Sequence, residues 1–378
     1  MDTTFWSFVY IAAAVQAGLL GVVLWRRKAN RQADRLLAVW VMLSGIDLAV
    51  KAVYWHLLSP EWFRAYRFVA LFPYLYGSLF FLYVRALTRG TRFRVRDVAH
   101  LLGFAAMFAL NARVFLMGRT QLQALSLRWQ GGERSIGLWF DLPLFVYSLS
   151  YVLAALIEVH RYRRHLRQQR SDADRLSLRW IELMALCQIV IWSIALVQEV
   201  VYLPLVNYGL LFGAVAAWIY IVGWLSLNQP AVAVEARSGG TRSEAADLSP
   251  GGVTPDDARF PDVEARLSEL MRGEAALYRE PALTIGQVAR RSGYPEYLVS
   301  AVINRRLGGS FWDYINRLRI EAVRKCLADA GDTRTILDIA YDCGFTSKST
   351  FNAAFKRQVG DTPSGYRKAV AAGLAPAD

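Results

Sequence analysis

Seven apolar stretches between Thr3 and Leu227 constrain the fold of this chain more than any other feature. Each has about 20 residues with few charges, which is the length that a helix needs to cross the hydrocarbon core of a bilayer. Because lipid offers no hydrogen bonds, backbone N–H and C=O groups there must pair within the segment, as they do in a helix. We predict spans at residues 4–25, 36–58, 68–87, 98–117, 138–159, 176–200 and 203–227.

The loops between these spans alternate between strongly and weakly basic. The strongly basic loops follow the first, third and fifth spans, and contain Arg26, Arg27, Lys28, Arg31 and Arg35, then Arg85, Arg89, Arg92, Arg94 and Arg96, then Arg161, Arg163, Arg164, Arg167, Arg170 and Arg175. Arginine and lysine accumulate on the cytoplasmic side of a membrane, where they also attract anionic lipid head groups. The pattern predicts an N-terminus outside and a C-terminus in the cytoplasm. The first basic cluster follows its apolar run, unlike the order in a cleavable signal peptide.

Four ionisable residues lie within or near the ends of the predicted spans. Asp47 and Lys51 are four residues apart in the second span, while Asp141 and Glu199 lie near the outer ends of the fifth and sixth. Such residues are costly in lipid and face a bundle interior or a cavity. Two interpretations of Asp47 and Lys51 stay open: an ion pair within one helix, or part of a pocket for a small-molecule or membrane signal that also includes Asp141 and Glu199.

The region after the last span changes character. Residues 229–261 are rich in Gly, Pro, Ala, Ser and charge, with no helical or strand period. This composition predicts a flexible linker with a root-mean-square reach of roughly 30 Å. We therefore expect a membrane domain at residues 1–228, a linker at 229–261, a second domain at 262–370 and a disordered tail at 371–378.

The stretch ILDIAYDCGFTSKSTFNAAFKRQVGDTPSGYR, residues 336–367, predicts a short helix, a tight turn and a second helix. Thr335 and Asp338 fit a helix N-cap, and Gly344 suits the left-handed end of that helix with Phe345 packed behind it. Ser347 is the expected cap of the second helix, whose inner face carries Phe351 and Phe355. The opposite face is polar, as a helix that reads a DNA major groove requires, and contains Lys348, Ser349, Asn352 and Lys356.

A similar pattern precedes it in LTIGQVARRSGYPEYLVSAVIN, residues 283–304. Thr284 and Gln287 fit a capping box, and Gly293 fits the turn. The buried side of the second helix is predicted to contain Leu298, Val299, Val302 and Ile303. An amphipathic helix from about Phe311 to Asp329 separates the two patterns, and we expect it to space them rigidly.

Two stretches of the sequence are similar to those of a known protein family. They are FWDYINRLRIEAVRKCL, starting at Phe311, and IAYDCGFTSKSTFNAAFKRQVGDTPSGYR, starting at Ile339. The region from about Pro261 to Val370 resembles the DNA-binding domain of AraC/XylS-type bacterial transcription regulators. In that family two helix-turn-helix units insert their second helices into successive major-groove segments. The resemblance implies double-stranded promoter DNA and RNA polymerase as partners, with a homodimer as a further possibility.

By matched position, the resemblance assigns roles to individual residues. Base reading falls to Tyr297, Ser300, Lys348, Ser349 and Asn352. Separately from the matched positions, we predict phosphate contacts from Arg305, Arg306, Lys356 and Arg357, and structural roles for Gly293, Gly344, Phe345, Phe351, Phe355, Pro363 and Tyr366. Ala301 and Ala353 stand where the family often has a base-contacting arginine, which predicts modest sequence preference. Pro295 replaces the usual serine cap of the first reading helix. A charged helix face alone is more often simply solvated; the two aligned patterns favour DNA.

Nothing in the sequence indicates catalysis. The three cysteines, Cys187, Cys326 and Cys343, have no metal-site spacing, and no HExxH, phosphate loop or serine elbow occurs. We therefore expect no cofactor, no metal and no enzyme activity.

These patterns together predict an all-α chain with two parts: a polytopic membrane helical bundle of about seven spans, then a cytoplasmic double helix-turn-helix domain. The expected function is that of a one-component transcription regulator in a bacterial inner membrane, controlled by a signal sensed in the membrane domain. Two alternatives remain. One is a membrane transporter or enzyme with a regulatory DNA-binding tail. The other is a constitutive regulator with a passive anchor, for which exchange of the spans for any neutral anchor would leave transcription unchanged.

Overall fold

The computed structural model of the chain describes residues 3–57, 59–91, 93–130, 138–176, 178–200, 206–227, 258–273, 276–329 and 331–372. Within these ranges the regular structure is helical, and the β-type pairing is limited to one isolated bridge, between Arg170 and Thr284. The predicted all-α class is confirmed. The chain divides into two compact units: Met1–His160 with Leu178–Ala236, and Arg161–Ser177 with Arg237–Asp378.

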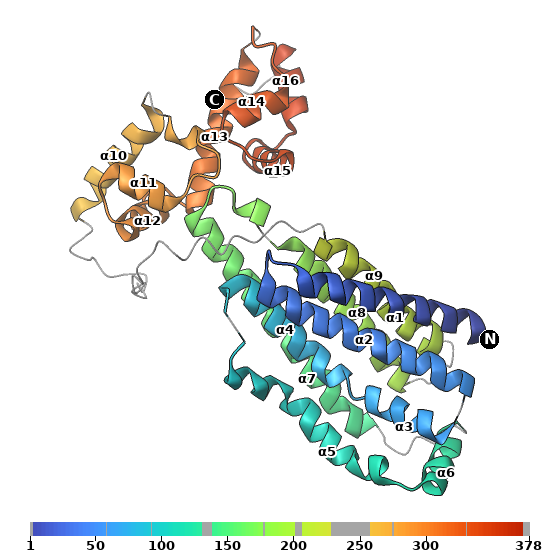
Figure 1. Cartoon of the computed structure of the whole chain (residues 1–378). Coiled ribbons are helices and arrows are strands. Elements are labelled where there is room, and N and C mark those ends of the chain that lie inside the picture. Colours follow the sequence, from blue (N-terminus) through green and yellow to red (C-terminus); the bar gives the residue numbers. More distant parts are fainter. Residues whose placement is uncertain are drawn as a thin grey trace. The chain divides into compact units, whose positions relative to one another are not determined.

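The first unit contains the apolar helices, coloured blue to yellow-green in Figure 1. In chain order they are α1 (Thr3–Arg26), α2 (Arg31–Leu57), α3 (Pro60–Val69), α4 (Pro73–Arg89), η1 (Val95–Leu101), α5 (Leu102–Leu116), α6 (Arg119–Gln130), the greater part of α7 (Leu138–Gln169), α8 (Arg179–Val200), η3 (Val206–Leu211) and α9 (Phe212–Leu227). Seven stretches among them are long and apolar enough to cross a membrane, and each overlaps one of the seven predicted spans.

Three local features differ from the sequence prediction. The third span is two helices, α3 and α4, because Pro73 begins α4 at a position where its missing N–H leaves no bond unmade. The predicted loop after the fourth span contains α6, whose sequence is too polar to form an apolar run. The fifth span does not end at Val159, since α7 continues to Gln169 through the basic sequence that was predicted to be a loop.

Close packing of α1 on α2 depends on small residues. A Cβ atom on Gly45 would lie 2.7 Å from the Cβ of Ala17, so a larger residue would push the two helices apart. On the other side of α2, the ring of Trp40 lies 5.6 Å from Phe80 of α4 and 4.4 Å from Trp218 of α9. The aromatic contacts and the glycine thus join α1, α2, α4 and α9 into one bundle.

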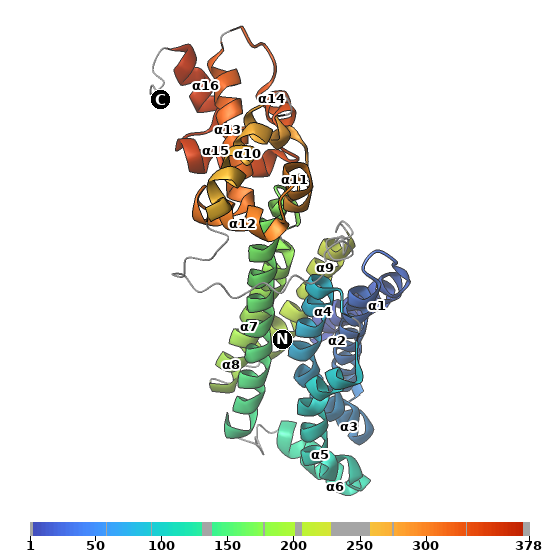
Figure 2. The ribbon, with the colours of Figure 1, turned by 90° about the vertical axis from the view of Figure 1, so that its left-hand side faces the viewer.

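The second unit contains the remaining helices, shown in orange and red in Figures 1 and 2. They are α10 (Phe260–Arg272), η6 (Leu277–Arg279), α11 (Ile285–Ser292), α12 (Glu296–Arg305), α13 (Phe311–Ala328), α14 (Ile336–Asp342), α15 (Lys348–Val359) and α16 (Pro363–Ala371). Because α10 begins at Phe260, the last two residues of the predicted linker are helical, and Phe260 is buried. Most of that linker lies outside the described residues.

Helix α13 is shared by two hydrophobic cores. Its first half, with Phe311, Tyr314, Ile315 and Leu318, packs with α10, α11 and α12 to form what we call the first lobe. Its second half, with Ile320, Val323 and Leu327, packs with α14, α15 and α16 to form the second lobe. Figure 1 shows α13 between these two groups of helices. Each lobe therefore rests on one end of a single 18-residue helix.

The boundary between the units falls where the sequence did not place it. Residues 161–176, which comprise the end of α7 and η2 (Ala173–Leu176), were predicted to belong to the membrane domain but group with the second unit. Leu166 and Ala173 form a hydrophobic cluster with Trp312 of α13, and all three are buried. We call residues 161–176 the α7–η2 segment.

Candidate nucleic-acid interface

The first helix-turn-helix unit consists of α11 and α12. Thr284 caps α11: its hydroxyl accepts from the Gln287 N–H at 3.3 Å, and the Gln287 side chain accepts from the Thr284 N–H at 2.8 Å. Gly293 ends the helix with φ 78°, in the left-handed region that glycine adopts without strain. Pro295 occupies the N-cap position of α12 and makes no side-chain capping bond.

The side chains that the sequence assigned to base reading by α12 have different exposures. Tyr297 is 50% exposed, whereas Ser300 and Ala301 are half-buried, and Ala301 packs against the core of the first lobe. The inner face, predicted as Leu298, Val299, Val302 and Ile303, is fully buried. Of Tyr297, Ser300 and Ala301, Tyr297 alone is exposed.

The second unit consists of α14 and α15. Thr335 and Ser347 cap the two helices, accepting from the N–H groups of Asp338 and Thr350 at 3.2 Å each. Gly344 has φ 91°, and a Cβ there would lie 2.6 Å from the carbonyl oxygen of Arg279 in η6. The turn thus needs glycine for its conformation and for a close approach to the first lobe.

Aromatic rings fill the inside of the second unit. The ring of Phe351 lies 5.2 Å from Phe345 and 5.8 Å from Phe355, which in turn lies 5.6 Å from Tyr366 of α16. Pro363 is the first residue of α16 and is buried. These contacts leave the outer face of α15 in solvent, where Lys348, Ser349, Asn352, Ala353, Lys356 and Arg357 are all exposed.

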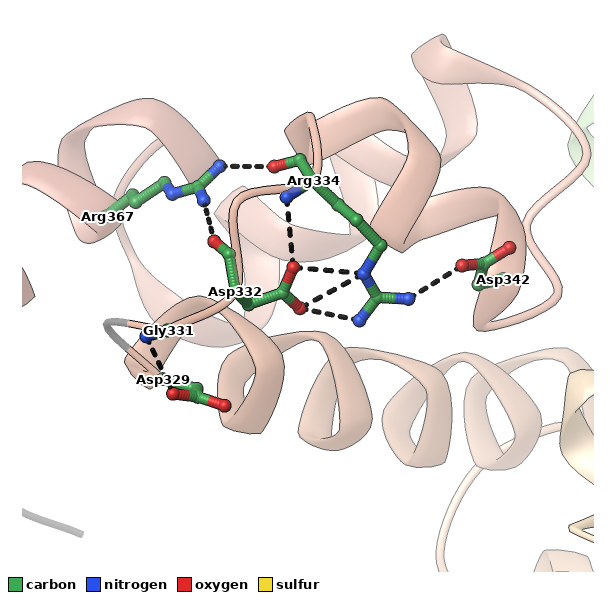
Figure 3. Close-up of polar contacts among 6 residues, drawn as sticks. All are labelled: Asp329, Gly331, Asp332, Arg334, Asp342 and Arg367. Carbon is green, nitrogen blue, oxygen red and sulfur yellow. Dashed lines mark hydrogen bonds and ion pairs between the residues drawn. The ribbon is translucent and has the colours of Figure 1, made fainter.

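A network of charged groups fixes the chain before α14 (Figure 3). The guanidinium of Arg334 donates to Asp332 at 2.5–3.2 Å and to Asp342 at 2.7 Å. Arg367 of α16 donates to the backbone oxygens of Arg334 and Asp332 at 2.8 and 2.6 Å. Hydrogen bonds from Arg334 hold the pKa of Asp332 down at about 2. The network joins the start of α14 to α16 at the surface of the second lobe.

Three of the four predicted phosphate contacts already interact within the protein. Arg306 lies 3.4 Å from Glu264, and the guanidinium of Arg305 lies 6.0 Å from the ring centre of Phe260. Arg357 donates to Asp313 at 3.2 Å and lies 4.6 Å from the ring centre of Trp312. Lys356 is exposed on α15. Phosphate binding by Arg306 and Arg357 would therefore compete with an internal carboxylate.

The sequence prediction missed Arg319 and Trp312, which are only 1% and 2% exposed. Burial lowers the pKa of Arg319 to about 10, and nearby Asp172 opposes that shift. Its guanidinium donates to the backbone oxygens of Tyr278 and Glu280 at 2.8 and 2.9 Å. An arginine in the middle of an otherwise apolar helix face was the signal in the sequence that could have singled it out.

In the first unit, Asp47 and Lys51 form an ion pair within α2 at 2.7 Å, and both side chains are buried. The Lys51 ammonium also lies 4.0 Å from the ring centre of Phe212 in α9. The side chains of Asp141 and Glu199 lie outside the described part, so their convergence with this pair stays a prediction. The sequence prediction passed over Glu158 of α7, which binds Arg89 of α4 at 2.5 and 2.6 Å.

Two helix-turn-helix units joined by one helix define a double helix-turn-helix DNA-binding protein. A family model described as a helix-turn-helix domain matches residues 288–369. The regulatory protein SoxS of Escherichia coli K12 is 36% identical over 89 residues, which are 22% of this chain and 78% of that protein. The probable transcription factor PqrA of Proteus vulgaris is 30% identical over 95 residues, which are 25% of this chain and 76% of that protein.

The chain belongs to the AraC/XylS-type family of transcription regulators. An HTH-type transcriptional regulator of Mycobacterium tuberculosis is also similar, with 36% identity over 87 residues, but the match spans 33% of that protein and 23% of this chain. No solved structure matches the chain. The similarity to each of these three regulators thus extends over about a quarter of the chain.

Proposed function

We propose that the chain is a membrane-anchored one-component transcription regulator, in which a seven-span unit in a bacterial inner membrane carries a promoter-binding domain in the cytoplasm. The observation that carries the proposal is the presence of two folded helix-turn-helix lobes in the same chain as seven apolar helical stretches, among the described residues, that are long enough to span a bilayer. Promoter DNA and RNA polymerase are its proposed partners, with the bilayer as anchor and a homodimer as a proposed assembly. The proposed role is not enzymatic.

Sequence preference is proposed to come chiefly from α15. Lys348, Ser349 and Asn352 form an exposed polar face, and an asparagine can bind the edge of adenine through two hydrogen bonds. On α12, Tyr297 and Ser300 offer one exposed ring and one half-buried hydroxyl. Position 301 of α12 and position 353 of α15 are alanine and not arginine, so we expect modest selectivity between DNA sequences.

The base-reading proposal is tested by changing Lys348, Ser349 and Asn352 together to alanine. Each bidentate base contact contributes about 1–3 kcal/mol of discrimination, so selectivity between target and random duplex should fall about tenfold or more. Competition binding at two salt concentrations measures it. A matched control changes Glu321 and Lys325, which are exposed on α13. Unchanged selectivity in the triple variant would contradict base reading by α15.

The orientation is proposed from the alternation of basic loops. A reporter fused after Leu227 should be active only in the cytoplasm, and a reporter within residues 118–137 only outside it. The opposite pattern, or activity of both on one side, would refute an N-terminus outside. The buried Asp47–Lys51 pair supports a sensing role, because polar groups held inside a bundle can respond to a ligand.

A further inference from the structure

The α7–η2 segment is attached to the first lobe by backbone hydrogen bonding. The Ser171 N–H donates to the carbonyl oxygen of Leu283 at 3.0 Å, and Arg170 forms an antiparallel bridge with Thr284, the N-cap of α11. Ser171 and Asp172 are buried. A loop that only set membrane topology would not need buried polar residues, so these contacts indicate a specific fit.

Arg319 connects the segment with both lobes. Its guanidinium donates to the Ser171 hydroxyl at 3.1 Å, in addition to the carbonyls beside η6 in the first lobe. The same guanidinium lies 5.7 Å from the ring centre of Phe345 in the second lobe. A buried cation must keep its hydrogen-bond partners, because losing one leaves a desolvated charge incompletely paired. Removal of the Ser171 hydroxyl would therefore disturb the contacts of Arg319 at the place where the two lobes meet.

Trp312 connects the segment with α15. Leu166 and Ala173 cover this side chain, and the Arg167 guanidinium lies 5.1 Å from its ring centre. Arg357 of α15 lies 4.6 Å from the same ring centre. The indole is thus fixed from one side by the segment and supports, through a cation–π contact, an arginine of the second reading helix.

We propose that the α7–η2 segment is an intramolecular docking element, which holds the two helix-turn-helix lobes in one mutual orientation by packing where they meet at α13. This inference rests on the proposed function and deepens it. Two reading helices must enter groove segments about one helical turn, roughly 34 Å, apart, so a change in their mutual orientation lowers affinity. In this proposal the docked orientation is the one that binds DNA.

The covalent path of the signal follows from the same feature. Helix α7 is continuous from Leu138 to Gln169, so the fifth candidate span leads directly into the docking element. A flexible linker transmits displacement poorly, whereas a helix transmits both translation and rotation along its axis. The proposed route to the DNA-reading helices therefore runs through α7.

The test uses the purified full chain in lipid nanodiscs. Leu166→Gln places a polar group against Trp312, whereas Arg164→Gln changes an exposed residue of the same helix and serves as the matched control. Hydrogen exchange reports the Ser171 amide, and titration with a random-sequence duplex of about 30 base pairs, roughly three turns, reports affinity. In Leu166→Gln we expect about tenfold faster exchange at Ser171 and about tenfold weaker binding. In Arg164→Gln exchange should not change, and affinity should stay within about twofold.

Two results would overturn the proposal. If Ser171 exchanges as fast in the wild type as in Leu166→Gln, the segment is not docked in solution. If exchange accelerates while affinity stays the same, docking does not control the lobes. Slow exchange of Val302 and Ile303 amides in the variant would show that the first lobe is still folded.

A wild-type chain that binds no duplex would contradict the proposed function instead. Docking would then be judged by the Phe345 amide, which donates to Ala340 and should also exchange faster once the segment leaves Arg319. Unchanged exchange at Phe345 would count against the proposed hold on the second lobe.

Discussion

Each of the two lobes contains a helix-turn-helix pair between two further helices, but the lobes are stabilised by different contacts. The first lobe is mainly aliphatic inside, and its buried set includes Val263, Leu267, Ile285, Val288, Leu298, Val299, Val302 and Ile303. The second lobe has an inner row of aromatic rings and an exposed charged network around Arg334 at its entry. The first lobe therefore has a mainly aliphatic core, whereas the second combines an aromatic core with a charged network that joins the start of α14 to α16.

The largest expected difference between the lobes concerns their turn glycines. Gly344→Ala should lower the free energy of unfolding by about 2–4 kcal/mol, because a Cβ would strain a left-handed residue and collide with the Arg279 backbone. Gly293→Ala should cost only about 1 kcal/mol, since its Cβ would meet open space. Hydrogen exchange of α12 and α15 amides in the full chain measures both. Equal losses would remove this distinction between the lobes.

The caps of the two reading helices should show a smaller difference. Ser347→Ala removes the bond to the Thr350 N–H and should destabilise α15 by about 1 kcal/mol. Pro295→Ala removes no capping bond, and a change below about 0.5 kcal/mol is expected for α12. Denaturant titration with exchange read at each helix tests the pair. A loss at Pro295 as large as that at Ser347 would show that proline stabilises α12 by another route.

The smallest effect should appear only in acid. Since the folded pKa of Asp332 is lowered to about 2, its ion pairs stabilise the second lobe above the unfolded pKa of about 3.9, and this contribution disappears as pH falls through 2. The thermal midpoint of the second lobe should fall more steeply between about pH 4 and 2 in the wild type than in Asp332→Asn. Exchange in the first lobe provides the internal control. Parallel pH profiles would contradict a structural role for the network.

Much of the fold could be predicted because it depends on local patterns. Seven apolar runs, Thr284 with Gln287, and Phe351 with Phe355 each express a periodicity or a cap within a few residues. The prediction was wrong where composition and conformation diverge. The basic sequence after Val159 reads as a loop, yet arginine, leucine and glutamine are good helix formers, and α7 continues through it.

The site was less accessible from sequence because its contacts are distant. Arg319 and Ser171 are 148 positions apart, and no local pattern pairs a serine in one basic loop with an arginine in α13. The exposed side chains of α12 and α15 were easier to predict, because the apolar residues of each helix identify its inner face and therefore also the opposite, outer face. Arg306 and Arg357 pair with Glu264 and Asp313, which lie on other helices. These pairs could therefore not be predicted from the sequences of α12 and α15 alone.

The contact between the α7–η2 segment and α13 is a contact within one chain, and this alters how strong it has to be. Two sites joined by a short flexible tether experience an effective concentration in the millimolar range. At an effective concentration of this size, an interface with an intrinsic dissociation constant of about 1 mM would be occupied roughly half of the time. Separate proteins with the same surfaces would hardly associate. Weak docking of this kind can be reversed by a small free-energy change, of the size that one bound ligand supplies.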